Sequence, residues 1–144
     1  MASDTTREYG LPITLEHAKS AALPALAEAR RNNWTMAVAI VDTAGDLVYF
    51  EKMDATQNGS VDVAIDKARS AARFKRPTKA FQDTLAEGGE GWRVLGLRHA
   101  IPIEGGVPLT RDGRIVGAIG VSGGSSQQDG QCATAAAATL QTPG

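Results

Sequence analysis

The sequence contains few of the residues that stabilise small folds covalently. Its single cysteine is Cys132, which excludes an intramolecular disulfide and a metal site made of cysteines alone. Aromatic residues make up only 5% of the chain. The core must therefore form by the close approach of small side chains, chiefly alanine and glycine, rather than around large rings. We expect Cys132 itself to be a small core residue.

The sequence also lacks the signals of two functional classes. Its 15 lysines and arginines against 16 aspartates and glutamates leave a formal net charge of −1, so a basic surface for nucleic acid is not expected. No stretch approaches the roughly 18 apolar residues of a membrane-spanning helix. Residues 1–10 carry neither the basic nor the apolar part of a secretion signal. We expect a cytoplasmic protein that binds neither nucleic acid nor membranes.

The length and composition are those of one globular domain. The chain has 144 residues, of which 42% are hydrophobic and 22% are charged, and both fractions are close to the globular average. No linker or repeat divides it. We predict a single domain over residues 1–144, with residues 1–10 as a loose N-terminal arm.

Helical spacing of small apolar residues predicts two main helices, and a capping-box pattern with an alanine-dense segment predicts a third. The first covers residues 14–31, with Thr14 as its N-cap and Pro24 bending or dividing it. The second covers residues 60–75. A third is predicted to begin at a capping-box pattern, residues 126–129, and to end near Leu140. Thr78 is predicted to cap a further short helix.

Short apolar runs separated by turn residues predict two β-hairpins. Their strands are residues 36–42, 47–53, 107–110 and 115–121. Residues 98–103 are a further extended candidate, and residues 87–91 are predicted to be a flexible break. Gly117 and Gly120 weaken a strand, so they mark the close approach of a helix, a backbone or a flat ligand. Adjacent hairpins favour an antiparallel sheet covered by helices, an α+β fold.

Four segments together resemble the GlcG/HbpS-like family of haem-binding proteins and the related C-terminal domain of PduO-type cobalamin adenosyltransferases. They are AIVDTAGDLVYFEKMD (residues 39–54), AIDKARSAARFKRPT (64–78), GGVPL (105–109) and GRIVGAIGVSGGSSQQD (113–129). Their order and spacing agree with the family pattern over nearly the whole chain. The resemblance implies a profilin-like central antiparallel sheet with helices on both sides, and self-association into dimers or larger rings.

His17, in the segment TLEHAK, is the candidate metal ligand. The resemblance implies this role, because a histidine in the first helix can coordinate iron in haem-binding relatives. His17 lies two positions after Leu15, roughly 200° around a helix, and so faces away from the apolar stripe. A neutral imidazole is a common axial ligand of haem iron. An ordinary exposed histidine near a helix start fits the same pattern, so both interpretations stay open. His99 has no support from the family, and we interpret it as structural.

Two glycine-rich segments are candidate cofactor-binding loops. Their residues are Gly105, Gly106, Ser122, Gly123, Gly124 and Ser125. Bare backbone N–H groups before a helix favour an anion, such as a haem propionate or a small organic acid. Neither a Walker A loop nor a GxGxxG fingerprint is present. A turn that simply needs glycine is the alternative.

The remaining polar residues assign no catalytic group. The letters from Gly120 to Gly124 match GxSxG, but the predicted helix begins only after Ser125, so the sharp nucleophile turn is missing. The scattered aspartates cannot be paired from the sequence. A basic cluster, residues 67–76, is predicted to be a solvated face, from which one or two side chains could pair with a ligand carboxylate.

Three hypotheses follow. The first is an oligomeric haem-binding protein for haem storage, sensing or degradation, in which His17 and the glycine loop before the final helix line one recess. The second is a catabolic enzyme or binder that holds a small organic acid at the glycine-rich helix start. The third is an interaction subunit without a ligand.

Overall fold

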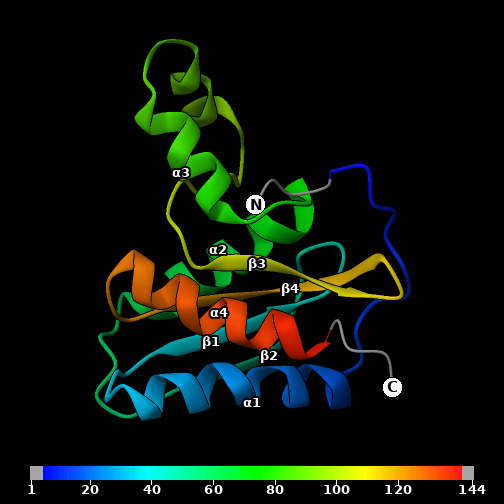
Figure 1. Cartoon of the computed structure of the whole chain (residues 1–144), viewed down its shortest axis with the longest axis vertical. Helices are drawn as coiled ribbons and strands as arrows, with labels where there is room; N and C mark the ends of the chain where they lie inside the picture. Colours follow the sequence, from blue (N-terminus) through cyan, green and yellow to red (C-terminus); the bar gives the residue numbers. More distant parts are fainter. Residues whose placement is uncertain (1–4, 141–144) are drawn as a thin grey trace.

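A computed structural model describes residues 5–140 as one sheet and its surrounding helices (Figure 1). The helices are α1 (Leu15–Arg31), α2 (Ser60–Phe74), α3 (Thr78–Ala86), the 3₁₀ helix η1 (Gly89–Gly96) and α4 (Ser126–Leu140). The strands are β1 (Ala37–Val41), β2 (Leu47–Lys52), β3 (Gly106–Arg111) and β4 (Arg114–Ser122). The main helices and both hairpins lie within one or two residues of the ranges that the sequence predicts.

The sheet is antiparallel throughout, with the strand order β2-β1-β4-β3. Two hairpins are joined side by side through β1 and β4, where Ile40 pairs with Ile119. Helices α1 and α4 cover one face, and α2 covers the other (Figure 1). The predicted α+β class is confirmed.

The two faces of the sheet bury side chains of different size. Val38 and Ile40 of β1 face α1 and α4, whereas Ala37, Ala39 and Val41 face α2. The small residues on the second face bring α2 close to the sheet. At Gly120 an added Cβ would collide with the backbone of α2 at the carbonyl of Ala64, so the predicted close approach is confirmed at this glycine.

Gly117 has a different neighbour. A Cβ at Gly117 would meet the carbonyl of Val41 in the adjacent strand and the side chain of Ile13. The glycine therefore accommodates a strand and the N-terminal segment rather than a helix or a ligand.

The prediction of a loose arm is wrong for residues 8–10. Tyr9 forms a parallel bridge with Ile115, and the amide of Gly10 donates to the Ile115 carbonyl at 2.8 Å. The Tyr9 hydroxyl donates to the Ala72 carbonyl at 2.6 Å. These bonds fix the segment along β4, a long-range contact that local composition does not show. Residues 1–4 of the predicted arm lie outside the described residues.

Four further predictions need correction. Helix α1 runs unbroken through Pro24, because burial of the neighbouring Ala21, Ala22 and Ala25 outweighs one lost backbone hydrogen bond. The predicted break at residues 87–91 runs into η1, and residues 98–103 form no strand. The Thr78 hydroxyl does not cap α3; it accepts a hydrogen bond from the amide of Gly106 at 2.9 Å.

Between residues 5 and 140, no helix has the length and apolar character needed to cross a membrane.

Candidate functional site

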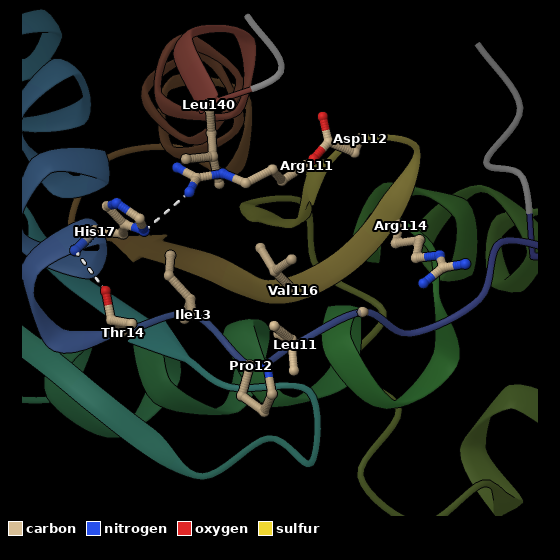
Figure 2. A pocket seen from close by; sticks show the side chains of 11 residues that line it. Leu11, Pro12, Ile13, Thr14, His17, Arg111, Asp112, Arg114, Val116 and Leu140 are labelled. Atoms are coloured by element: carbon tan, nitrogen blue, oxygen red, sulfur yellow. Dashed lines mark hydrogen bonds between the residues drawn. The ribbon is translucent and has the colours of Figure 1, made fainter. Parts of the chain in front are cut away.

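A pocket of about 550 Å³ lies where the β3–β4 hairpin meets the start of α1 (Figure 2). Its volume is within the range of about 300–1,000 Å³ found for small-molecule sites. The wall is apolar at Leu11, Pro12, Ile13, Val116 and Leu140, and polar at Thr14, His17, Arg111, Asp112 and Arg114. The pocket therefore combines an apolar surface with polar groups, of which His17 and Arg111 point toward one another (Figure 2).

Helix capping places His17 in this pocket. Thr14 is the N-cap of α1, and its hydroxyl accepts a hydrogen bond from the backbone amide of His17 at 3.2 Å. The amide of Ile13 donates to the Val116 carbonyl at 2.8 Å. Because the segment before α1 is bonded to β4, the first turn of the helix has a fixed position against the hairpin.

The turn between β3 and β4 places two arginines opposite one another. Asp112 and Gly113 have φ values of 53° and 77°, as a tight turn of the Asp-Gly type requires. Arg111 and Arg114 are directly paired across the two strands, and both line the pocket. Like charges in this arrangement destabilise a hairpin, so this end of the pocket is suited to an anionic group.

His17 and Arg111 interact directly. Nη1 of Arg111 lies 3.0 Å from Nδ1 of the half-buried His17 (Figure 2). A guanidinium group has donors only, so Nδ1 accepts and the hydrogen of the neutral ring is on Nε2. The imidazole is thus held in one orientation and in one tautomer.

The charge at Arg114 is only weakly compensated. Arg114 forms an ion pair with Glu8 at 3.7 Å, and the two side chains are 61% and 78% exposed. Exposed pairs of this kind contribute little to stability. The Arg114 guanidinium therefore stays available to a ligand.

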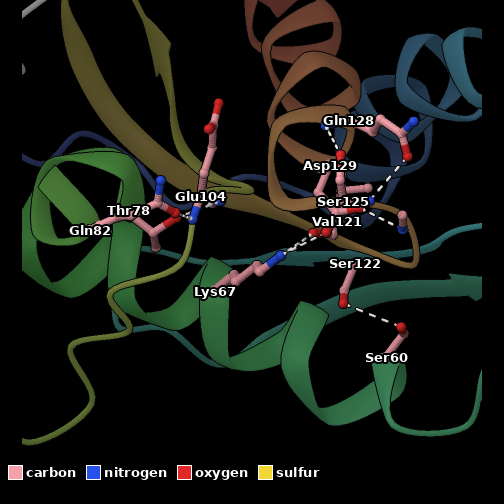
Figure 3. Close-up of polar contacts among 12 residues, drawn as sticks. Ser60, Lys67, Thr78, Gln82, Glu104, Val121, Ser122, Ser125, Gln128 and Asp129 are labelled. Carbon is pink, nitrogen blue, oxygen red and sulfur yellow. Dashed lines mark hydrogen bonds and ion pairs between the residues drawn. The ribbon is translucent and has the colours of Figure 1, made fainter. Parts of the chain in front are cut away.

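The two glycine segments meet elsewhere, around a buried ion pair (Figure 3). Nζ of Lys67 lies 2.9 Å from Oδ2 of Asp129, and their side chains are 1% and 4% exposed. Lys67 also donates to the Val121 carbonyl at 3.0 Å. A Cβ at Gly105 would lie 2.7 Å from Nζ of Lys67, so this glycine makes room for the ammonium group. The expectation that residue 67 belongs to a solvated basic face is wrong.

The N–H groups of the glycine loop bind side chains of the chain itself. The amide of Gly124 donates to Oδ1 of Asp129 at 2.9 Å. Ser125 and Gln128 form a reciprocal capping box, with bonds of 3.0 Å from the Ser125 amide and 3.2 Å to the Ser125 hydroxyl. The box begins one residue before the predicted position. Asp129 and Gln128 thus take the places that an external anion was expected to fill.

Burial shifts two titratable groups near this loop. The pKa of Asp129 is raised by burial, an effect that the charge of Lys67 and the amides of Gly123 and Gly124 oppose. Burial also raises the pKa of the Cys132 thiol to about 11. Cys132 is fully buried, so the prediction that it is a small core residue is confirmed.

His17 and the glycine loop do not share a recess within one chain. The pocket of His17 includes Leu140 at the end of α4, whereas residues 122–125 precede the start of α4. Helix α4 has 15 residues and therefore separates the two features by roughly 20 Å. The expectation of a common recess is wrong for a single chain, because α1 and α4 pack side by side in opposite directions, with Glu28 beside Gln131.

His99 lies in a second, smaller pocket of about 240 Å³, together with Asp66, Arg69 and Ile101. His99 is exposed, with φ of 70°. Throughout residues 5–140, no group of three or more histidine, cysteine, aspartate or glutamate side chains is placed to hold a metal ion.

Comparisons with known proteins agree on one family and one fold. A family model described as "Haem degrading protein HbpS-like" matches residues 13–138. Protein GlcG of Escherichia coli K12 is 39% identical over 95 residues, which is 66% of this chain and 69% of GlcG.

Two solved structures extend the similarity to almost the whole chain. A double mutant of Streptomyces reticuli HbpS is 30% identical, with a TM-score of 0.83 over 99% of this chain and 96% of HbpS. A PduOC–haem complex is 25% identical, with a TM-score of 0.79 over 92% of this chain and all of PduOC.

Proposed function

The chain belongs to the HbpS-like family, and from this premise we propose that it binds haem in the pocket beside His17. One observation carries the proposal: a half-buried imidazole and two cross-strand guanidinium groups line a pocket of about 550 Å³ whose remaining wall is largely apolar. The similarity to PduOC, which was solved as a haem complex, supports it.

The residues in the pocket fit the chemistry of haem. The imidazole of His17 would hold the iron through a ring nitrogen. Leu11, Pro12 and Val116 would contact the apolar macrocycle, and Arg111 and Arg114 would pair with the propionates. Bound haem would supply an iron centre for redox or oxygen chemistry. Storage, sensing and degradation of haem all begin with this binding step.

A haemin titration tests the proposal. Haemin should produce a saturable Soret shift, and His17→Asn should weaken binding by at least about tenfold, since it removes the side chain that would hold the iron. His99→Asn is the matched control, because asparagine tolerates the left-handed φ of 70° at this exposed position. An unshifted spectrum at stoichiometric haemin, or equal losses in the two variants, would contradict the proposal.

A small organic acid is the second candidate ligand of this pocket. The paired Arg111 and Arg114 favour a carboxylate, whereas the glycine loop has already bound Asp129 and Gln128. Thermal stabilisation by a panel of carboxylic acids, with none by haemin, would favour this candidate. Loss of that stabilisation in Arg111→Met would place the acid in the pocket.

We also propose that the chain forms homo-oligomers through the projection formed by α3 and η1 (Figure 1). Trp92 and Leu95, both in η1, are 64% and 69% exposed, and exposed apolar side chains that cluster are typical of interfaces. Light scattering should show a multiple of the monomer mass, which Leu95→Glu lowers. Leu23→Glu, at an exposed leucine of α1, is the control. A monomer at all concentrations would contradict this assignment.

A further inference from the structure

The hydrogen bond between His17 and Arg111 occupies the nitrogen lone pair that metal ligation needs. A neutral imidazole has one nitrogen with a hydrogen and one with a free electron pair. Nη1 of Arg111 donates to Nδ1 of His17 at 3.0 Å. The only lone pair of the neutral ring therefore points at a cation, and Nε2 carries the hydrogen.

Ligation through either nitrogen requires Arg111 to move. If Nδ1 is the ligand, the guanidinium blocks it. If Nε2 is the ligand, its hydrogen must first pass through solvent to Nδ1, which would then face Arg111 as a second donor. Because two donors cannot form a hydrogen bond with one another, the contact between His17 and Arg111 and ligation by the neutral ring exclude each other.

A ligand carboxylate would be a better partner for Arg111 than His17. Across residues 5–140, Arg111 has no ion pair, and its side chain is half-buried at the pocket. The other charged groups that line this pocket are Asp112, which is exposed in the turn, and Arg114. Arg–carboxylate pairs are frequently bidentate and join two opposite charges, whereas the contact with His17 is a single bond from a charged donor to a neutral ring. A carboxylate in the pocket would therefore draw Arg111 away from the imidazole.

We propose that Arg111 is a latch that makes metal ligation by His17 conditional on a carboxylate of the same ligand. The inference rests on the proposed function and deepens it, because it assigns the specificity of the pocket to metal macrocycles that carry carboxylates. Without a carboxylate, Arg111 stays on Nδ1 and occupies the only lone pair of the neutral ring. With a carboxylate, Arg111 moves to the oxygens and leaves His17 available.

The sharpest test compares haemin with haemin dimethyl ester, which has the same iron and macrocycle but no free carboxylate. Wild-type protein should bind the ester at least about tenfold more weakly than haemin, as expected for the loss of a charge-assisted contact. Arg111→Met should bind the ester several-fold more tightly than the wild type does, because the latch is gone. The same variant should bind haemin more weakly, so that its preference for haemin nearly disappears.

Arg114→Met is the matched control. Arg114 lies opposite Arg111 on the same hairpin but has no hydrogen bond to His17 among the described residues. This variant should weaken haemin binding and leave binding of the ester unchanged. A gain for the ester in both variants, or in neither, would overturn the latch. Weaker ester binding in Arg111→Met would also overturn the latch. It would show that Arg111 supports ligation by His17, as a deprotonated imidazolate, rather than blocking it.

A second measurement needs no porphyrin. Long-range ¹H–¹⁵N correlation spectra of the free protein should show His17 with its hydrogen on Nε2 and Nδ1 as an acceptor. In Arg111→Glu the carboxylate can accept from Nδ1–H, so the tautomer should reverse. A hydrogen on Nδ1 in the free wild-type protein overturns the latch and leaves the proposed function standing. If neither porphyrin binds, the proposed function fails and the latch fails with it.

Discussion

At the scale of single residues, the buried Lys67–Asp129 ion pair is the feature that the sequence predicts least. The two residues are 62 positions apart in the sequence, and the loop between β4 and α4 turns Asp129 toward α2. Each charge is tolerated in the interior because the other is 2.9 Å away. Lysine is almost never fully buried without a partner. The sequence therefore predicts a solvated position for Lys67, because it does not show that Asp129 lies beside it in the fold.

The first prediction concerns this ion pair. Lys67→Met should lower the free energy of unfolding by about 3–5 kcal/mol, because it leaves an uncompensated buried carboxylate. Adding Asp129→Asn should recover a large part of the loss, since asparagine can still accept from the amide of Gly124. Urea unfolding of both single variants and the double variant measures the coupling. Additive losses would show that the two side chains act independently.

The second prediction is a pH dependence at the same position. Burial raises the pKa of Asp129 from 3.8, and the charge of Lys67 opposes the rise. In Lys67→Met the pKa of Asp129 should rise further, because the opposing charge of Lys67 is gone. A carboxyl whose pKa is raised on folding contributes most to the stability of the fold at pH values below its unfolded pKa. This stability is lost as the pH rises through the folded pKa.

The stability difference between Lys67→Met and the double variant Lys67→Met/Asp129→Asn should therefore be small near pH 3.5 and grow toward neutral pH. Urea unfolding of both proteins across this range is the measurement. A difference that does not change with pH would mean that Asp129 keeps one protonation state throughout.

At the scale of elements, helices and strands follow from apolar periodicity, whereas caps and irregular segments depend on their neighbours. Periodicity locates α1 and α2, because each places small residues on one buried stripe, and the capping-box pattern with the alanine-dense segment locates α4. It does not locate η1, whose glycines indicate a flexible break. Nor does it show that the hydroxyl of Thr78 binds the amide of Gly106 across the fold.

The third prediction tests where α4 begins. Ser125→Ala should cost about 1 kcal/mol of stability, as expected for the loss of an N-cap. Ser126→Ala, at the position where the sequence alone places the cap, should stay within about 0.5 kcal/mol of the wild type. Thermal unfolding of the two variants makes the comparison. Equal effects at the two serines would contradict a cap at Ser125.

The fourth prediction tests the contact between α2 and β4. Gly120→Ala should destabilise the protein by about 1–3 kcal/mol, because the new methyl group collides with backbone that cannot move without shifting α2. Gly59→Ala is the control, since a Cβ at Gly59 meets no atom within 4 Å. Urea unfolding should show little change for the control. A neutral Gly120→Ala would mean that α2 lies further from the sheet.

At the scale of the whole molecule, the sheet decides which predicted site residues meet. Strand β4 has nine residues and so spans roughly 30 Å. Its first residue, Arg114, lines the pocket of His17, and its last residue, Ser122, begins the glycine loop before α4. The sequence indicates His17 and the glycine segments as separate motifs, but only the strand direction shows that they lie at opposite ends of the sheet.

The pocket itself was only partly predictable from the sequence. His17 could be singled out through the family resemblance, which implies a haem-ligating histidine in the first helix. Arg111 and Arg114 stand in the sequence on either side of an Asp-Gly pair that is typical of a tight hairpin. Like charges directly opposite one another destabilise a hairpin, and this was the signal for an anionic partner. The contribution of Leu11 and Pro12 depends on the bridge between Tyr9 and Ile115, which no local pattern reveals.

The most direct test of the central claim is a crystal structure of the protein grown with stoichiometric haemin. The account predicts iron bonded to a ring nitrogen of His17, the macrocycle against the apolar wall of the same pocket, and a propionate on Arg111 in place of the imidazole. Haem at the loop formed by residues 122–125, or in the pocket of His99, with His17 still bonded to Arg111, would contradict it.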